Sequence, residues 1–315
     1  MIRRRARRVL ILGEGAAAEA LREAWRAAPH HRARRWQVLE TAPPSSAEVE
    51  RAAQKGADAL VLAMDAPPSA ELLRALVRAR ERGVLVWPGA AFYAALSGRV
   101  PLEHLSAADW QILLATPPPR PLYAALKRAL DVLVALFGLL LFALILPLLA
   151  ALIALDSRGP ILFRQERVGQ GGHIFHIVKL RTMIPDAERG IGPQWARRDD
   201  PRATRIGRWL RRARLDEVPQ LFNVLRGEMS LVGPRPERPA FVQELERAWP
   251  VYRLRHIVKP GITGWAQVQY HYGHTPADAR VKLEYDLYYL LHRSPRLDAL
   301  IVLRTVSQVL RLRGV

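Results

Sequence analysis

Two adjacent acidic residues in the second half of the chain, Asp216 and Glu217, are the first candidates for chemistry. They stand between Leu215 and a Val-Pro pair. Neighbouring side chains on a helix point about 100° apart, so two carboxylates can serve one pocket and perform different tasks. One can act as a nucleophile or as a Mg²⁺ ligand, and the other as an acid or a base. An Asp-Glu dipeptide is also commonplace, so its surroundings must decide.

Basic residues crowd the segment just before this pair. They are Arg202, Arg205, Arg208, Arg211, Arg212 and Arg214. Guanidinium groups bind phosphate oxygens through paired hydrogen bonds and stay charged. Mg²⁺ prefers one or two carboxylates together with substrate phosphate oxygens, and Asp216 is the candidate ligand. The segment therefore indicates a site for a phosphorylated substrate. The alternative is a basic helix face, with Arg205, Arg208 and Arg212 at spacings of three and four, that contacts solvent or anionic lipid headgroups.

An apolar run must hold such a site in place. Residues 132–155 carry no charge and lie between Asp131 and Asp156. As a helix this run extends about 36 Å, which is enough to cross a hydrocarbon layer of about 30 Å. The run has no amphipathic period, so it predicts a membrane segment. A fully buried core helix is the alternative.

The flanks of the run bear on its topology. Lys and Arg stand on both sides of it, and basic residues favour the cytoplasmic side of a membrane. Pro147 lies inside the run, where it removes a backbone hydrogen bond and clashes with the preceding turn. We therefore expect a re-entrant helix hairpin that enters and leaves by one face, with a full span as the alternative.

The first 116 residues alternate strand and helix patterns. Apolar strands are expected at 9–12, 59–65 and 84–88, with helical segments between them, which is typical of parallel βαβ units. The turn Gly-Glu-Gly-Ala-Ala-Ala at 13–18 approaches a dinucleotide-binding fingerprint. Glu14 places a negative charge where phosphates would lie, so nucleotide binding and a structural or regulatory role both stay open.

Composition limits the function classes. The chain has 315 residues, a formal net charge of +19 and no cysteine. A missing cysteine excludes a disulfide scaffold, a thiolate zinc site and a cysteine nucleophile. The basic excess predicts an anionic partner, either nucleic acid, an acidic membrane surface or a phosphorylated substrate. The short apolar stretch after the basic N-terminus ends at Glu14, so no signal peptide is expected.

Four segments together resemble a known family. They are KRALDVLVALFG through IVKLRTM (127–183), DPRATRIGRWLRRARLDEVPQLFNVLRGEMSLVGPRPE (200–237), KPGITGWAQV (259–268) and YDLYY (285–289). In order and spacing they are similar to the bacterial sugar transferase family, the monotopic polyprenyl-phosphate phosphoglycosyl transferases. The first 116 residues look like the degenerate Rossmann-type, CoA- or nucleotide-binding-like domain that precedes this module in larger members.

The resemblance implies a reaction at the cytoplasmic face of the inner membrane. A sugar 1-phosphate would move from a UDP-sugar to polyprenyl (undecaprenyl) phosphate, with release of UMP and with Mg²⁺ as cofactor. Asp216 would form an aspartyl phosphosugar intermediate, and Glu217 would be the general base toward the acceptor. Arg211 matches a phosphate-contacting position, Arg235 lies in a Pro-Arg-Pro motif that shapes the nucleotide pocket, and Asp286 matches a functional acid.

Three further residues are substrate-binding candidates. Lys179 and Arg181 can meet lipid phosphate or substrate, or they can anchor the protein at the membrane interface. His271 stands where some family members carry arginine, and a structural histidine is the alternative there. Leu146 stands where some small members carry serine, so the repair of the backbone near Pro147 is left open.

The expected fold class is α/β. A Rossmann-like domain covers 1–116, a proline-rich linker 117–125, and a mostly helical α+β phosphoglycosyl transferase domain 126–315, with a membrane helix hairpin at about 129–155. The expected partners are a UDP-sugar, polyprenyl phosphate and the lipid bilayer, but not nucleic acid, and a homo-oligomer is left open. The product would initiate an exopolysaccharide, capsule or O-antigen-type glycan. The alternative function is a catalytically inactive scaffold of a membrane glycan-assembly complex.

Overall fold

The computed structural model describes residues 6–64, 66–185, 187, 192, 200–270 and 275–311. The chain divides into two compact units, Met1–Pro117 and Pro118–Val315. It is a mixed α/β protein with a parallel sheet in the first unit and a long apolar helix in the second.

The first unit is built on a four-stranded parallel sheet in the order β2-β1-β3-β4. Its strands are β1 (Arg7–Gly13), β2 (Trp36–Ala42), β3 (Ala59–Ala63) and β4 (Leu85–Pro88). The central strands read as apolar runs because helices cover both faces of the sheet. The predicted parallel βα arrangement is therefore confirmed.

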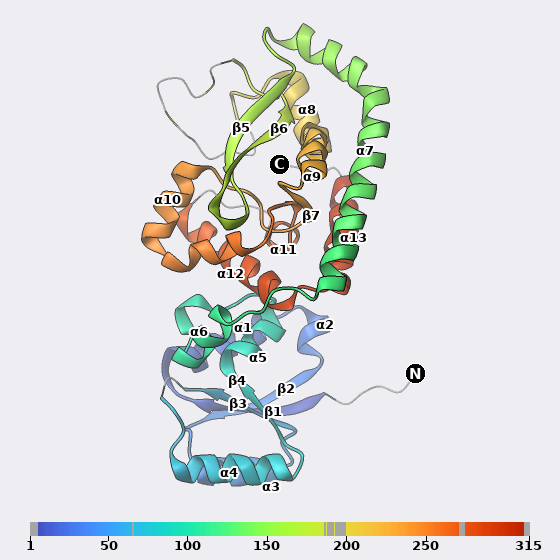
Figure 1. The fold of residues 1–315 in the computed structure, drawn as a ribbon. Helices are drawn as coiled ribbons and strands as arrows, with labels where there is room; N and C mark the ends of the chain where they lie inside the picture. Colours follow the sequence, from blue (N-terminus) through green and yellow to red (C-terminus); the bar gives the residue numbers. More distant parts are fainter. Residues whose placement is uncertain are drawn as a thin grey trace. The chain divides into compact units, whose positions relative to one another are not determined.

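Alternate residues of the central strands belong to two separate cores. Leu10 and Leu60 face α3 (Ser46–Gln54) and α4 (Ala70–Glu81), while Ile11 and Val61 face α1 (Gly15–Ala27) and α5 (Gly89–Ser97). Figure 1 shows these helix pairs on opposite faces of the sheet. The remaining elements are α2 (His30–Ala33), η1 (Leu102–His104) and α6 (Ala107–Leu114).

The glycines of the Gly-Glu-Gly turn have structural roles in this fold. A Cβ at Gly13 would overlap the Ala63 carbonyl of β3, and Gly15 has a φ of +76° at the start of α1. Only glycine adopts such a conformation without strain. Both glycines are therefore accounted for by the strand-to-helix connection, without a phosphate.

The second unit is mostly helical around two small sheets. It contains α7 (Pro121–Asp156), β5 (Leu162–Val168), η2 (Gln170–Gly172), β6 (Ile174–Leu180), α8 (Arg205–Ala213), η3 (Leu215–Gln220), α9 (Leu221–Arg226), β7 (Ser230–Val232), α10 (Pro239–Ala248), η4 (Pro250–Ile257), β8 (Gly261–Thr263), α11 (Trp265–Gln269), α12 (Pro276–His292) and α13 (Pro295–Leu310). Strands β5 and β6 form an antiparallel hairpin, and the alternation of Ile, Phe and Val around the Gly-Gln-Gly-Gly turn is typical of such a hairpin. Strands β7 and β8 pair in parallel.

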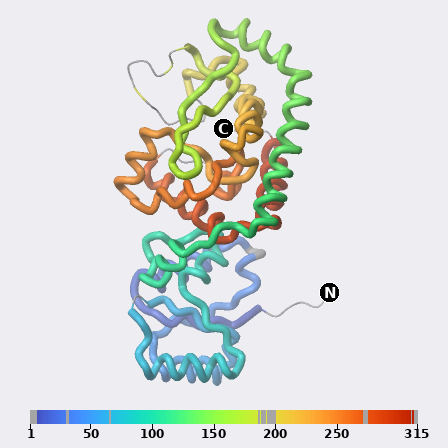
Figure 2. The backbone as a smooth tube through the Cα atoms, viewed as in Figure 1, coloured from blue at the N-terminus to red at the C-terminus, as the bar shows by residue number. Residues whose placement is uncertain are grey.

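Helix α7 is the one helix in the described part of the chain that is long and apolar enough to cross a membrane. It continues through Pro147, and Figure 2 shows that it bends in its second half instead of stopping. The expected break at Pro147 is therefore a bend within one 36-residue helix. A proline inside a helix removes one backbone bond and commonly produces such a kink.

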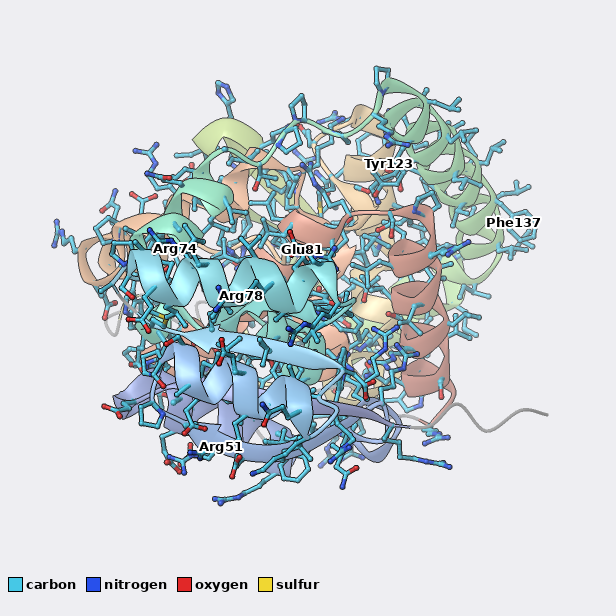
Figure 3. The ribbon with its side chains drawn as sticks, turned by 90° about the horizontal axis from the view of Figure 1, so that it is seen from below. Arg51, Arg74, Arg78, Glu81, Tyr123 and Phe137 are labelled. Carbon is cyan, nitrogen blue, oxygen red and sulfur yellow. The ribbon has the colours of Figure 1, made fainter. Side chains whose placement is uncertain are left out.

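One stripe of α7 packs against the rest of its unit along almost the whole helix. The buried residues of this packed stripe are Asp131, Ala135, Phe142, Leu149 and Ile153. Its amino-terminal half contacts β6 and α9, and its carboxyl-terminal half contacts β6 and α8. The other faces expose large apolar side chains such as Leu144 and Leu155, and Phe137 points outward in Figure 3.

Candidate active site

The Asp-Glu pair lies in the short 3-10 helix η3, directly after α8. Arg214 ends α8 with a φ of 55° and a ψ of 21°, and among the residues that the structure describes it is the one non-glycine residue with positive φ. This left-handed conformation costs an L-residue roughly 1–2 kcal/mol, and such strained turns cluster at functional sites. The turn leaves Arg211 near enough to Asp216 for its charge to act on that carboxylate.

Glu217 is held between two cations. Its Oε1 accepts a hydrogen bond from Lys179 Nζ at 3.0 Å and another from Arg235 Nη2 at 2.7 Å. Arg214 Nη1 lies 3.8 Å from Oε2. Burial alone would raise the pKa of Glu217, but the charges of Arg235 and Lys179 outweigh it and hold this pKa well below its usual range. Glu217 is therefore ionised and fixed in place.

Asp216 differs from its neighbour in having no such partner. The residue is 8 % exposed, and within the described ranges its carboxylate makes no ion pair or hydrogen bond. Burial raises its pKa, and the charge of Glu217 adds to this, while Lys179, Arg211 and Arg235 oppose it; the result is a pKa of about 6. A buried carboxylate among cations, without a direct partner, is available to a substrate.

Asn223 fixes the strand that carries Lys179. Its Oδ1 accepts from the backbone N–H of Val178 at 3.1 Å, and its Nδ2 donates to the carbonyl of His176 at 2.8 Å. Asn223 is completely buried at the start of α9. This one side chain therefore links β6 to the helix that follows the Asp-Glu pair, and it holds Lys179 beside Glu217.

Arg235 comes from the loop between β7 and α10. Its side chain is 39 % exposed, so a ligand can reach the guanidinium while one nitrogen stays on Glu217. The prolines at 234 and 236 fix the backbone on both sides of it. The structure thus brings together four of the residues singled out in the sequence, namely Asp216, Glu217, Lys179 and Arg235, with Arg211 close by.

Asp286 stands behind this group. Its Oδ2 accepts from Arg255 Nε at 3.0 Å and from Arg255 Nη2 at 2.8 Å. Asp286 is 1 % exposed and Arg255 is 4 % exposed. In this structure the Asp286 carboxylate therefore faces a protein arginine and has no open side for a substrate.

Arg181 lies at the end of α7. It is 7 % exposed, and its Nη2 donates to the carbonyls of Ile153 and Ser157 at the carboxyl-terminal end of that helix. A guanidinium at this position satisfies carbonyls that have no partner within the helix. The contacts seen here attach α7 to β6 and are not contacts with the Asp-Glu pair.

The remaining sequence candidates lie elsewhere. Arg205, Arg208 and Arg212 are exposed on α8, as the spacing predicted, and Trp209 beside them is 51 % exposed. Their face is therefore open to solvent or headgroups. His271 lies outside the residues that the structure describes.

Comparison with known proteins assigns the module that contains this site. Residues 122–312 match the family described as bacterial sugar transferase. The chain belongs to the bacterial sugar transferase family. The resemblance found in the sequence is confirmed, and residues 122–312 are called the sugar transferase module below.

The sugar transferase module is similar to several curated proteins. The UDP-N-acetylgalactosamine-undecaprenyl-phosphate N-acetylgalactosaminephosphotransferase of Aeromonas hydrophila is 46 % identical over 215 residues, which are 68 % of this chain and 50 % of that protein. The undecaprenyl-phosphate glucose phosphotransferase of Komagataeibacter xylinus is 46 % identical over 187 residues, 58 % of this chain and 35 % of that protein. The UDP-glucose:undecaprenyl-phosphate glucose-1-phosphate transferase of Caulobacter vibrioides is 46 % identical over 196 residues, 62 % of this chain and 73 % of that protein. The match thus spans half or less of the first two relatives.

The side chains of the sugar transferase module can bind Mg²⁺ only if substrate oxygens supply further ligands. In the described part of the chain, no group of three or more His, Asp or Glu side chains could hold a metal ion. Asp216 nevertheless offers a carboxylate with no partner in the described ranges, whereas Glu217 is occupied by Lys179 and Arg235. One carboxylate together with phosphate oxygens is a usual Mg²⁺ environment. The residues present are consistent with a metal that is bound together with a phosphorylated substrate.

The first unit contains a separate cavity of about 610 Å³. It lies beside the carboxyl ends of β3 and β4, and α1, α5 and α6 supply much of its lining. None of its lining residues is Lys or Arg, and most are alanine, proline or other apolar side chains. The lining therefore gives no support for a bound phosphate, which agrees with the structural explanation of the Gly-Glu-Gly turn.

Proposed function

We propose that this protein transfers a sugar 1-phosphate from a UDP-sugar to polyprenyl (undecaprenyl) phosphate, with release of UMP. The names of the relatives, which pair undecaprenyl phosphate with UDP-N-acetylgalactosamine or UDP-glucose, support this class of substrates. The observation that carries the proposal is the Asp216 carboxylate, which is buried and has no direct partner among the described residues but is acted on by Lys179, Arg211 and Arg235. The product would initiate synthesis of an exopolysaccharide or a related glycan.

The reaction has two displacements at one phosphorus atom. An Asp216 oxygen attacks the sugar-bearing phosphorus of the donor, the bond from that phosphorus to the bridging oxygen breaks, and UMP leaves with the oxygen. A phosphate oxygen of polyprenyl phosphate then attacks the same phosphorus, and the bond to Asp216 breaks. The cations around Asp216 stabilise the negative charge that develops on the phosphoryl oxygens. When bound, Mg²⁺ would neutralise diphosphate charge, with Asp216 as its protein ligand.

Glu217 contributes chiefly by orientation in this proposal. Its two ion pairs favour the ionised form, which can accept a proton but is a weak base. A phosphate monoester has a second pKa of about 6, so most of the acceptor is already fully ionised at neutral pH. Glu217 therefore holds Lys179 and Arg235 toward the phosphates and assists the acceptor as a base only to a small extent.

The membrane is the surface on which we propose that the reaction takes place. The packed stripe of α7 runs from Asp131 to Ile153, so a helix that crossed the bilayer would draw β6, α8 and α9 into the hydrocarbon with it. Exposed leucines on the other faces of α7 fit lipid better than water. We infer a re-entrant arrangement at the cytoplasmic face of the inner membrane, with the bend near Pro147 inside the apolar layer.

The first unit is proposed to be a Rossmann-like domain with a structural or regulatory role. Its parallel sheet with helices on both faces supports that fold. The described residues that line its cavity include no Lys or Arg, so they give no support for a nucleotide as its ligand.

The test is UMP release by the purified protein in detergent, with undecaprenyl phosphate, Mg²⁺ and a panel of UDP-sugars that includes UDP-glucose and UDP-N-acetylgalactosamine. Asp216→Asn should abolish release. Asp131→Asn is the matched control, because this buried carboxylate accepts the Leu231 N–H at 3.0 Å and an asparagine oxygen can do the same. Intact-protein mass spectrometry with donor alone should show a phosphosugar adduct on the wild type and not on Asp216→Asn. A folded wild type that releases no UMP from any donor would support the inactive scaffold instead.

A further inference from the structure

All four backbone carbonyl groups of the loop at residues 234–237 accept a hydrogen bond. The first carbonyl accepts from the Gly261 N–H and the fourth from the Val168 N–H, both at 2.9 Å. Two of the four residues are prolines and have no N–H to donate. Because these two residues cannot donate a backbone hydrogen bond, the loop is held mainly through its carbonyl groups.

The two middle carbonyls accept from side chains. Arg255 Nη2 donates to the carbonyl of Arg235 at 2.8 Å, and Arg167 Nη1 donates to the carbonyl of Pro236 at 3.0 Å. Hydrogen bonds from charged donors are roughly twice as strong as those between neutral groups. Two consecutive peptide groups, on either side of the Pro236 Cα, are thus fixed by guanidinium groups from η4 and β5.

Arg255 is itself fixed by other groups. Asp286 binds its Nε and Nη2, and the Tyr252 hydroxyl accepts from Nη1 at 2.8 Å. Arg255 is 4 % exposed, so it has no route to a substrate. A buried arginine with four hydrogen bonds in fixed directions defines the place of the carbonyl that it holds.

Arg167 holds the next carbonyl, that of Pro236. It precedes the loop in the sequence, whereas Arg255 follows it. Its Nη2 donates to Gln165 Oε1 at 2.6 Å, and its Nη1 lies 3.6 Å from a Glu237 carboxylate oxygen. Its side chain is 15 % exposed. The strand β5 thus fixes the loop through Arg167 as η4 does through Arg255.

We propose that Arg255 and Arg167 are positioning residues that aim the Arg235 guanidinium at the phosphates, and that Asp286 acts through Arg255. The inference rests on the proposed function, because Arg235 is a phosphate-binding group only if that function is right. It assigns to Asp286 an indirect role. Neither arginine touches the substrate, and each acts through the backbone of the loop.

A double-mutant cycle tests this inference. The proteins are wild type, Arg235→Ala, Arg255→Lys and the double variant, and the measured quantity is kcat/KM for UMP release. Lysine keeps the charge but loses the fork that reaches both Asp286 and the loop. Arg255→Lys should lower kcat/KM by on the order of 10²-fold in the wild type, since displacements of about 1 Å have such effects. In the Arg235→Ala background it should change kcat/KM by less than about 3-fold, because the group that it positions is gone.

Three comparisons make the cycle decisive. Asp286→Asn should follow the same pattern as Arg255→Lys. Arg167→Lys, in a less buried place, repeats the cycle if Arg255→Lys does not fold. Arg128→Lys is the matched control, because Arg128 also donates to two consecutive carbonyls, those of Val224 and Leu225, but not to this loop. It should leave kcat/KM within about 3-fold of wild type.

The outcomes separate this inference from the proposed function. Losses that multiply in the double variants would overturn the positioning role, because a general structural defect persists when Arg235 is absent. If the wild type releases no UMP, the proposed function has failed, and hydrogen exchange of the peptide that covers 233–238 then decides the inference. Exchange there should be faster in Arg255→Lys and Arg167→Lys than in Arg128→Lys, and equal rates would overturn the positional role.

Discussion

Replacing Gly207 by alanine should destabilise the sugar transferase module, although alanine favours helices. Gly207 lies inside α8, where alanine is intrinsically about 1 kcal/mol better than glycine. A Cβ at this position would overlap the Thr182 carbonyl oxygen and would lie 2.7 Å from its carbonyl carbon. These are backbone atoms and cannot rotate away. The same oxygen accepts the Thr204 N–H at 3.0 Å at the start of α8, so the helix sits directly on this carbonyl.

The size of the effect follows from that contact. Carbon atoms at rest lie about 3.5–4.0 Å apart, so α8 must move away by roughly 1 Å. Overpacking of this kind costs about 1–3 kcal/mol, and rigid backbone favours the upper end. After the gain in helix propensity, a net loss of about 2 kcal/mol remains. At about 2–4 °C per kcal/mol for a unit of this size, Tm should fall by about 4–8 °C. Because α8 carries Arg211, UMP release should fall by on the order of 10²-fold.

Thermal unfolding in detergent and UMP release below Tm are the two assays. Gly138→Ala in α7 is the matched control, because its Cβ would meet only the end of the Leu221 side chain, at 2.6 Å, and that side chain can turn aside. This variant should melt within a few degrees of wild type and keep its activity. A Gly207→Ala protein that melts at or above the wild-type temperature would refute the close approach of α8 to Thr182.

Three other predictions concern the turn, a buried histidine and the metal. Arg214→Gly should be more stable than Arg214→Ala by about 1 kcal/mol, because both lose the side chain but only glycine relieves the positive φ; equal Tm values would contradict this. Burial, with the charges of Arg255 and Arg253, lowers the pKa of His256 to about 3. The unfolded chain then binds a proton below about pH 6.5 that the folded chain does not, so stability is full above that pH and is lost as pH falls. Between pH 7 and pH 5 the loss should be about 2 kcal/mol by denaturant titration, and His256→Gln should remove this part of the slope; an unchanged slope would assign it to other groups. Chelation by EDTA should stop UMP release without lowering Tm, and Mg²⁺ should restore it, whereas activity in EDTA would exclude the metal.

Local patterns in the sequence were sufficient for much of the fold. The strands β1, β3 and β4 of the first unit, the β5–β6 hairpin and the exposed arginine face of α8 each depend on residues within a few positions of one another. The Asp-Glu pair could also be found, because its arginine-rich context and its family resemblance are both local in sequence. Its 3-10 geometry could not, since it depends on the left-handed turn at Arg214.

The supporting groups of the site could not be predicted in this way. Arg255, Arg167 and Asn223 meet their partners across 20, 69 and 47 positions, and one sequence does not report such pairings. Asp286 was singled out in the sequence, but its partner Arg255 is visible only in three dimensions. Pro147 signalled a departure from a straight helix, and packing against α8 and β6 turns the expected break into a bend.

The long contact of α7 with its unit has a mechanical consequence. Because the packed stripe reaches from Asp131 to Ile153, α7 and the described part of its unit that carries Asp216 form one body. In the proposed membrane arrangement, the immersion depth of the helix would fix the distance of Asp216 from the lipid headgroups, and so from the phosphate of the proposed acceptor. A thicker or thinner bilayer would shift Asp216 relative to the headgroups, and the turnover rate would then depend on the thickness of the bilayer.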